Sequence, residues 1–407
     1  MQPASSKTRL ILILGIVNAL TPFTIDLYLP AFGDIARDLG STVAQVSLSV
    51  ATYFVGFAIG QLIYGPLLDR FGRKPPVYFG LALYLLATIG CMTAHSVEAL
   101  LVFRFLTAIG GSAASVASVT MVRDYFEAKE GARVFSMLML VLSVSPLFAP
   151  TIGSWIAEGF GWRTIFGVLF GLALIDFALV AFGLPKVHQP DRTVSLRPRE
   201  LFQGFVEVFR VQEFRSYTIA GALSFSGLFV YLTGSAGIFI DGFQLTKQQY
   251  GYVFAALAGA MIGAGQVNNL LLKRSTSGRI ARVALTAQVF ASLLFLVLSV
   301  SMPLGFWTVS AFLFVILGCV GFVYPNTAAL SLSSFTRNAG RASSLMGFIQ
   351  MGLGALLASV VGVMDAKGTL PIALVIGFSS TLAWFVLRRA PEVVLAEGQA
   401  GSAGPVH

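Results

Sequence analysis

Three ionisable side chains lie inside long apolar segments of this 407-residue sequence: Asp26, Arg104 and Asp176. A charge inside such a segment is costly to bury, so each one is a hypothesis about function. A carboxylic acid beside a fixed guanidinium can bind and release a proton, because the cation stabilises the ionised form. We therefore interpret Asp26 and Arg104 as a proton-coupling pair and Asp176 as the alternative proton carrier.

The two charges of this pair are predicted to lie at similar depth. Asp26 precedes Pro30, where its apolar segment ends, and Arg104 follows Ala99, where a later segment begins. At 1.5 Å per helical residue, Asp26 lies roughly 6 Å and Arg104 roughly 7 Å from the same face of the membrane, because the first span ends there and the fourth begins there. The residues leave open a second interpretation, in which the two form a permanent structural bridge that does not titrate.

The composition places these segments in a membrane. Hydrophobic residues make up 56% of the chain and charged residues only 11%, whereas soluble domains carry about 25% charged residues. Runs near the length of a membrane-spanning helix, about 20 residues, recur along the whole chain. They predict an all-α membrane protein with twelve spans, at residues 10–30, 45–67, 76–95, 99–121, 133–157, 163–185, 216–240, 249–272, 280–302, 306–331, 341–364 and 370–389.

The basic residues predict the orientation of these spans. With the N-terminus inside, 22 of the 27 Lys and Arg residues fall on the cytoplasmic side, and Arg104 lies within a span. Only Arg37, Arg163, Lys247 and Lys367 fall on the other side. Cytoplasmic loops carry such an excess of basic residues, so we expect both termini to be cytoplasmic.

A polar segment divides the chain in two. We predict an N-terminal six-helix half over 1–185, a cytoplasmic linker over 186–215, a C-terminal six-helix half over 216–390 and a disordered tail over 391–407. Apolar linker residues at near-helical spacing predict an amphipathic helix at the membrane surface. They are Leu201, Phe202, Phe205, Val208 and Phe209.

The same sequence disfavours other classes of protein. The net charge of +9 comes from residues scattered in short loops, which form no basic stripe for nucleic acid. Cys91 and Cys319 each lie in an apolar run and indicate no metal cluster. The sequence contains no phosphate-binding G-x-x-x-x-G-K-[S/T] loop and no reactive cluster at one membrane face, so we expect neither an ATP-driven pump nor an enzyme. We expect no metal and no cofactor, with a proton gradient as the energy source.

The loop between the second and third spans carries the most specific motif, Gly65-Pro-Leu-Leu-Asp-Arg-Phe-Gly-Arg-Lys-Pro75. It resembles the G-x-L-x-D-R-x-G-R-K/R loop of the major facilitator superfamily, whose fold has twelve transmembrane helices in two halves. In that family the loop is a conformational latch that meets the start of the eleventh helix. The alternative is a solvated loop that only orients the protein. The implied latch residues are Gly65, Asp69, Arg70, Gly72, Arg73, Asp124 and Arg341.

Other spans narrow the resemblance to one branch. The segment T-P-F-T-I-D-L-Y-L-P at 21–30 looks like the first helix of Bcr/CflA-type drug:proton antiporters, and R-F-L-T-A-I-G at 104–110 resembles their fourth. Helices one and four are neighbours in the superfamily, which implies that Asp26 and Arg104 meet. Thr107 departs from the branch, because Gln is common at this position.

The fifth span adds a further resemblance. Pro146, Pro150 and Gly153 stand where the antiporters carry the motif that kinks this helix. Ala149 is a departure, because a glycine often precedes the proline. The departures weaken the assignment to antiport and leave the fold unaffected.

The superfamily fold also implies which residues face a central cavity, because helices 1, 4, 7 and 10 line it with help from 2, 5, 8 and 11. Aromatic walls with few polar anchors suit an amphiphilic compound of little charge. Packing is an alternative role for each of these side chains. The candidates are Asn18, Tyr28, Tyr53, Phe57, Phe225, Tyr231, Gln266, Asn326 and Gln350.

Together these features predict a proton-coupled secondary transporter that exports amphiphilic drugs or antibiotics by alternating access. Its expected partners are a small-molecule substrate, protons and the lipid bilayer, and we expect a monomer in a bacterial inner membrane. Two alternatives remain open: a metabolite transporter of the same fold, and a non-transporting membrane receptor.

Overall fold

The computed structural model describes residues 4–125, 145, 148–184, 197–335, 339–364 and 368–391. These residues form helices and connecting turns, with no strand among them. Eleven of the helices are long and apolar enough to cross a membrane. Most of the predicted fifth span, 133–157, lies outside the described residues, and its described end belongs to a helical stretch at 148–160.

Each half is a bundle of antiparallel helices. The first contains α1 (Ala4–Asp26), the 3₁₀ turn η1 (Leu29–Ala31), α2 (Phe32–Asp38), α3 (Val43–Phe71), α4 (Lys74–Met92), α5 (Val97–Tyr125), α7 (Trp162–Ala178) and the π-helical turn η2 (Leu179–Gly183). The second contains α9 (Gln212–Ala236), the π-helical turn η3 (Gly237–Gly242), α10 (Lys247–Leu271), α11 (Ser277–Ser301), α12 (Phe306–Leu332), α13 (Ala339–Val363) and α14 (Leu370–Arg388).

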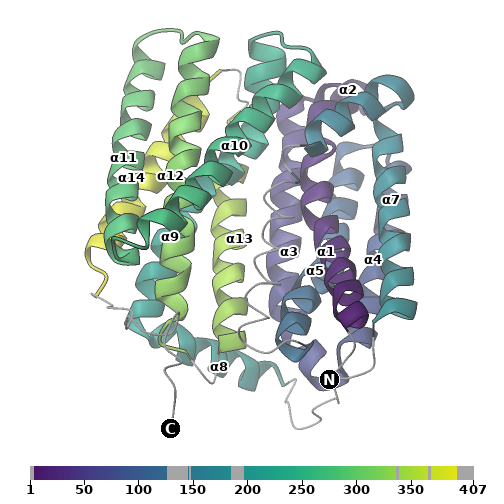
Figure 1. Ribbon diagram of the computed structural model, residues 1–407. Helices are drawn as coiled ribbons and strands as arrows, with labels where there is room; N and C mark the ends of the chain where they lie inside the picture. Colours follow the sequence, from purple (N-terminus) through teal and green to yellow (C-terminus); the bar gives the residue numbers. More distant parts are fainter. Residues whose placement is uncertain are drawn as a thin grey trace.

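A further helix, α8 (Pro198–Arg210), lies across the end of the molecule where α1 begins (Figure 1). We call this end the terminal face and the other end the opposite face. In α8, Phe205 and Val208 pack on Ala342 and Leu345 at the start of α13, whereas Phe202 is exposed. The apolar linker residues thus face two ways, toward the bundle and toward the membrane surface.

Large apolar side chains cover the outside of both halves. In a water-soluble protein such an extended apolar surface is rare, but hydrocarbon solvates it well. The exposure is therefore that of a lipid-facing surface. Residues more than half exposed include Phe79, Leu86, Phe182, Phe290, Trp307 and Phe378.

The two halves contact each other along α3 and α13. Three glycines mark this contact, because a Cβ added at any of them would meet the facing helix. A Cβ at Gly362 would lie 2.5 Å from Leu48, one at Gly347 2.0 Å from Gln61, and one at Gly65 3.2 Å from Ser344. Small residues allow helix backbones to approach closely in a membrane. The helices therefore stay close from one face to the other.

The helices α3 and α10 begin in the same way at the opposite face. Thr42 and Gln45 form a capping box at the start of α3, and Thr246 and Gln249 form one at the start of α10. Each box satisfies backbone N–H groups that the first helical turn leaves without partners. The second long helix of each half thus starts with the same local chemistry.

Close backbone contact between α4 and α5 leads to a prediction. A Cβ on Gly110 would lie 2.6 Å from both the Gly80 carbonyl oxygen and the Tyr84 backbone nitrogen, so a whole helix must move to admit it. We expect Gly110→Ala to lower the free energy of unfolding by about 1–3 kcal/mol, the usual cost of overpacking. Thermal unfolding in detergent micelles measures this, with Gly171→Ala as control because its Cβ position is empty. Equal stability of the two variants would contradict the close packing.

Candidate functional site

The Arg104 side chain is fully buried inside the first half. Its guanidinium lies over two aromatic rings, 4.3 Å from the Tyr28 centroid and 4.5 Å from the Tyr53 centroid. One amino group, Nη2, donates to the Thr24 carbonyl oxygen at 3.1 Å. The rings and this carbonyl stabilise the cation through cation–π attraction and one hydrogen bond.

Arg104 nevertheless keeps unused hydrogen-bonding capacity. Its Nε and Nη1 groups are buried and have no hydrogen-bond partner among the described residues. No carboxylate of the described chain forms an ion pair with it. A buried donor without a partner costs about 1–3 kcal/mol, more for a charged group. The arrangement is therefore suited to an acceptor that comes and goes.

Neighbouring side chains hold this arrangement in place. The Tyr28 hydroxyl shares a hydrogen bond with Ser49 Oγ at 2.7 Å, and the Tyr84 hydroxyl shares one with Thr24 Oγ1 at 2.7 Å. These bonds tie α1 to α3 and α4. The rings and the carbonyl that contact Arg104 are thereby fixed from three helices.

Asp26 lies at the end of α1 and does not pair with Arg104. Its side chain is 4% exposed, and among the described residues its carboxylate has no ion pair and no hydrogen-bond partner. Tyr28 lies past the end of α1, where the chain has left the helix and leads into η1. Tyr28 faces Arg104, and Asp26 faces the second half, within electrostatic range of Tyr231 and Tyr250. The predicted pair is therefore absent from this structure.

The described end of the fifth span packs against α1 beside Asp26. A Cβ on Gly153 would lie 1.7 Å from the Leu27 carbonyl oxygen, so only glycine allows this approach. Pro150 is also buried, and its carbonyl accepts a hydrogen bond from Ser154 Oγ at 2.9 Å. Pro146 lies outside the described residues. The packing of this helix therefore helps to set the position of the chain that carries Asp26.

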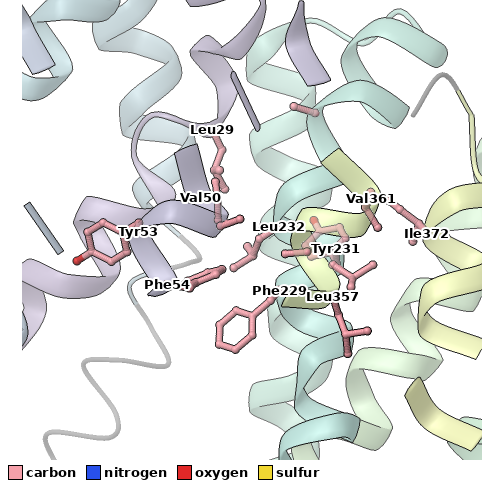
Figure 2. Close-up of a cluster of buried hydrophobic side chains, with 14 of the residues drawn as sticks. Leu29, Val50, Tyr53, Phe54, Phe229, Tyr231, Leu232, Leu357, Val361 and Ile372 are labelled. Atoms are coloured by element: carbon pink, nitrogen blue, oxygen red, sulfur yellow. The ribbon is translucent and has the colours of Figure 1, made fainter. Parts of the chain in front are cut away.

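Aromatic rings cross the boundary between the halves. Figure 2 shows Phe54 of α3 next to Phe229 of α9, and their ring centroids are 4.1 Å apart. Phe229 in turn packs on Phe225 at 5.3 Å, and Phe225 packs on Tyr324 of α12 at 4.5 Å. The sequence singled out Phe225 but missed Phe54 and Phe229, which lie one residue and four residues from candidates it named. These side chains form an apolar wall shared by both halves.

The other cavity candidates lie in different surroundings. Phe57 is buried and stacks on Tyr53 with 6.1 Å between centroids, and Gln350 is buried beside the Tyr324 hydroxyl. Asn18 is buried. Gln266 is exposed on α10 and lines no described contact between the halves.

The Asn326 side chain forms hydrogen bonds inside the second half. Its side-chain nitrogen donates to Asn268 Oδ1 at 2.6 Å and to the Phe322 carbonyl oxygen at 2.8 Å. These bonds link α10 to α12. Its amide thus serves helix packing in this structure.

The latch residues gather at the terminal face. Asp69 accepts a hydrogen bond from Arg73 Nη1 at 2.7 Å, and Gly72 turns the chain with φ +84°. Arg70 lies 5.9 Å from the Phe71 ring. Asp69 thus pairs within its own loop, whereas the resemblance placed it at the start of α13.

Two other expected members of the latch lie near the start of α13 and contact different residues. Arg341 is exposed near the start of α13, and its guanidinium lies against Gly204 of α8, where an added Cβ would be 2.9 Å from Nη1. Gly65 faces α13 through Ser344. The side chain of Asp124 lies outside the described part of the chain.

Asp176 is the second buried carboxyl group. It is 1% exposed on α7, and its Oδ2 has no hydrogen-bond partner among the described residues. The helix α7 packs on α4 and α1, both within the first half. Asp176 therefore lies away from the boundary between the halves.

The sequence missed an ion pair that joins the halves at the opposite face. Asp34 of α2 pairs with both Lys247 of α10 and Arg37 of its own helix. Ser154 Oγ donates to the Lys247 carbonyl oxygen at 2.9 Å. The scarcity of charge on this face was the available signal, because Lys247 is one of few basic residues there.

A second charged cluster at the opposite face belongs to the first half alone. Asp38 pairs with Arg163 and accepts from the Trp162 indole nitrogen at 3.2 Å. Arg163 also donates to the carbonyl oxygens of Met92 and Ala94, both at 3.0 Å. This cluster ties α2, α4 and α7 together.

No group of three or more potential metal ligands exists among the residues that the structure describes.

Known proteins resemble this chain over its length. The family model of the Major Facilitator Superfamily matches residues 14–359. A bicyclomycin resistance protein homolog from Haemophilus influenzae is 32% identical over 390 residues, covering 95% of this chain and 98% of that protein. The multidrug resistance protein MdtL of Shewanella oneidensis is 27% identical over 374 residues, covering 91% and 93%.

Solved structures share the architecture at low sequence identity. The crystal structure of a D-xylose-proton symporter aligns with a TM-score of 0.73 at 13% identity, covering 94% of this chain and 97% of the other. A bacterial homolog of the human lysosomal transporter Spinster, in an inward-facing and unoccupied conformation, aligns with a TM-score of 0.66 at 14% identity, covering 96% of each chain. At this identity the likeness concerns the fold alone.

The unpaired guanidinium leads to a prediction about stability. We expect Arg104→Met to unfold at a temperature no lower than the native protein, because it removes a buried cation without a counter-ion and the flexible thioether fills the space. Tyr84→Phe, which deletes one end of the bond to Thr24 Oγ1, should instead cost about 1 kcal/mol. Thermal unfolding in micelles distinguishes the two, and a large loss of stability in Arg104→Met would show that the cation is held by a strong partner.

Proposed function

This chain belongs to the major facilitator superfamily and to its bicyclomycin-resistance (Bcr/CflA) branch, and on that premise we propose that it exports amphiphilic drugs in exchange for protons. The observation that carries the proposal is Asp26, a buried carboxyl group without a partner at the boundary between the halves. Burying an unpaired carboxylate costs far more than burying the neutral acid. Asp26 can therefore carry a charge only when something compensates it.

Three partners can supply that compensation in turn. Arg104 offers two unused donor groups if the chain at Asp26 turns toward it. In this structure the close contact between Gly153 and Leu27 holds that chain in its present packing. A cationic or polar drug can approach Asp26 from the boundary between the halves. A proton from water is the third. Because proton and drug compete for one group, uptake of one favours release of the other, which is the logic of antiport.

The surroundings of Asp26 support an amphiphilic substrate. Phe54, Phe225, Phe229 and Tyr324 supply aromatic surface from both halves. Such a wall binds apolar bodies of different shape, and a few polar groups orient them. The names of the relatives, bicyclomycin resistance protein and multidrug resistance protein, support export of antibiotics and other drugs.

The wider setting follows from the same proposal. We place the protein in a bacterial cytoplasmic membrane as a monomer, with the terminal face and both termini in the cytoplasm. The excess of basic residues at that face supports this orientation. Protons then enter from the opposite face and the proton gradient supplies the energy.

Alternating access needs contacts that break at one face while others form. In this structure the Asp34–Lys247 pair and the Ser154–Lys247 hydrogen bond join the halves at the opposite face. The long α3–α13 contact remains a candidate axis, because its close packing runs from face to face. The end of α1 lies between these two features, so a change at Asp26 can bias the whole motion.

The central test replaces the proton-binding group. We expect Asp26→Asn to reduce drug efflux driven by an imposed pH gradient at least tenfold in proteoliposomes, because the amide cannot exchange a proton. Exchange of labelled for unlabelled drug without a gradient should continue, since it needs no proton. Bicyclomycin, chloramphenicol and tetraphenylphosphonium are suitable probes.

The control is Asp176→Asn, which alters the other buried carboxyl group and should keep gradient-driven efflux. If the native protein moves no probe, the proposed drug export is wrong. If Asp26→Asn responds to the gradient as the native protein does, the coupling role of Asp26 is wrong.

A further prediction concerns the ion pair at the opposite face. Asp34→Asn should open this face more often, because a partly buried pair contributes about 1 kcal/mol, equivalent to about a fivefold change in population. The measurement is the rate at which an impermeant maleimide labels Val50→Cys, at a buried position between the halves, after Cys91 and Cys319 are replaced by Ala. Asp38→Asn is the matched control, because its partner Arg163 lies in the same half. Equal labelling in both variants would contradict a gating role.

A further inference from the structure

Two buried polar groups without partners lie on opposite sides of the boundary between the halves. One is the Asp26 carboxylate at the end of α1. The other is the Tyr231 hydroxyl on α9, whose residue is 1% exposed and whose oxygen has no hydrogen-bond partner among the described residues. Buried polar groups without partners are rare in folded proteins, so each one calls for an explanation.

The two groups are close enough to act on each other. Asp26 exerts an electrostatic effect on the hydroxyls of Tyr231 and Tyr250. The turn η1, which begins three residues after Asp26, packs on α9 and α10. Figure 2 shows Tyr231 in the cluster where Leu29 and Val50 of the first half meet α9. The carboxylate and the phenol thus belong to one contact region.

Other groups around Asp26 are already engaged. The Tyr250 hydroxyl shares a hydrogen bond with Ser235 Oγ at 2.8 Å. Lys247, at the start of α10, pairs with Asp34, and Arg104 of α5 faces Thr24, Tyr28 and Tyr53. Arg104 keeps two unused donors, but its guanidinium lies over Tyr28 and Tyr53 within the first half. Of the described titratable groups that the second half brings to this region on α9 and α10, Tyr231 is the one with an unused donor.

We propose that Tyr231, in the second half, is a positioning residue whose hydrogen bonding depends on whether Asp26 is ionised. We infer that its hydroxyl turns to donate to the carboxylate when Asp26 is ionised, a bond that the two groups do not make in this structure. This link then holds the opposite face of the empty carrier closed until a substrate displaces it. This role rests on the proton-coupled export proposed above. Within it, Tyr231 prevents protons from crossing when no drug is exported.

The physical basis is the difference between two hydrogen bonds. A phenol that donates to a carboxylate makes a charge-assisted bond, roughly twice as strong as one to a neutral acid. Because the donor and the acceptor lie in different halves, the difference acts directly on the equilibrium between closed and open states. Protonation of Asp26 weakens the link, and so does a substrate that takes the place of the phenol.

The consequence concerns proton leakage. If an empty carrier with ionised Asp26 opened to the opposite face, it would take up a proton, return and release that proton at the terminal face without moving any drug. The link from Tyr231 makes this opening rare. Removing the hydroxyl of Tyr231 while keeping the ring should therefore allow protons to cross the membrane without any drug being moved.

The test is Tyr231→Phe in proteoliposomes under an imposed pH gradient, with proton entry followed by an internal pH dye in the absence of drug. We expect drug-independent proton flux to rise about tenfold over that of the native protein, the effect of losing one charge-assisted hydrogen bond. Tyr250→Phe is the matched control and should stay within about twofold of native, because its hydroxyl serves Ser235. Flux through Tyr231→Phe equal to native would overturn the proposal.

A double variant separates this role from a merely structural one. In Asp26→Asn, which has no proton to carry, Tyr231→Phe should add no proton flux and should not further change the affinity for drug, because the linked partner is gone. A leak that persists in the double variant comes from damaged packing and overturns the proposal. Failure of the native protein to move drug counts against the proposed function. If the native protein transports drug but Tyr231→Phe shows no added proton leak, this inference alone is wrong.

Discussion

A membrane interior cannot solvate charge, and the arrangement of this protein depends on that constraint. The Arg104 cation is stabilised by two aromatic rings and one carbonyl, all within the first half. Asp26 has no such partner and lies at the boundary between the halves. The Arg104 cation is therefore partly stabilised within its own half, with two donors left unused, whereas the charge on Asp26 depends on which state the protein adopts and on what is bound. This asymmetry is what makes Asp26 suitable for coupling.

The packing between the halves serves the same end. Glycines along α3 and α13 bring backbones together without large side chains, and the Phe54–Phe229 contact can separate without leaving a polar group unpaired. The one ion pair given for the described residues that joins the halves, Asp34–Lys247, lies at the opposite face, where it has access to water. The halves can therefore rearrange at modest cost while each half remains rigid.

Much of the candidate site could be predicted from the sequence, but not its pairing. The distance of Asp26 and Arg104 along their helices follows from residue counts, and the structure leaves them on neighbouring helices. Their directions around the helix axes do not follow, because neighbours on every side are apolar and the spans show little amphipathic pattern. Asn326 similarly turned out to bond Asn268 within its own half. The latch loop turns at Gly72, while Asp69 pairs with Arg73 instead of α13.

By itself the sequence determined the class of protein, because hydrocarbon tolerates only long apolar helices and each span is visible as a local run of residues. The all-α fold in two halves is confirmed by the family match and the shared architecture. Only the tertiary structure decided which side chains meet, because contacts such as Asp34 with Lys247 join residues more than two hundred positions apart. Such meetings depend on how whole helices rotate and tilt against each other, which local composition does not encode.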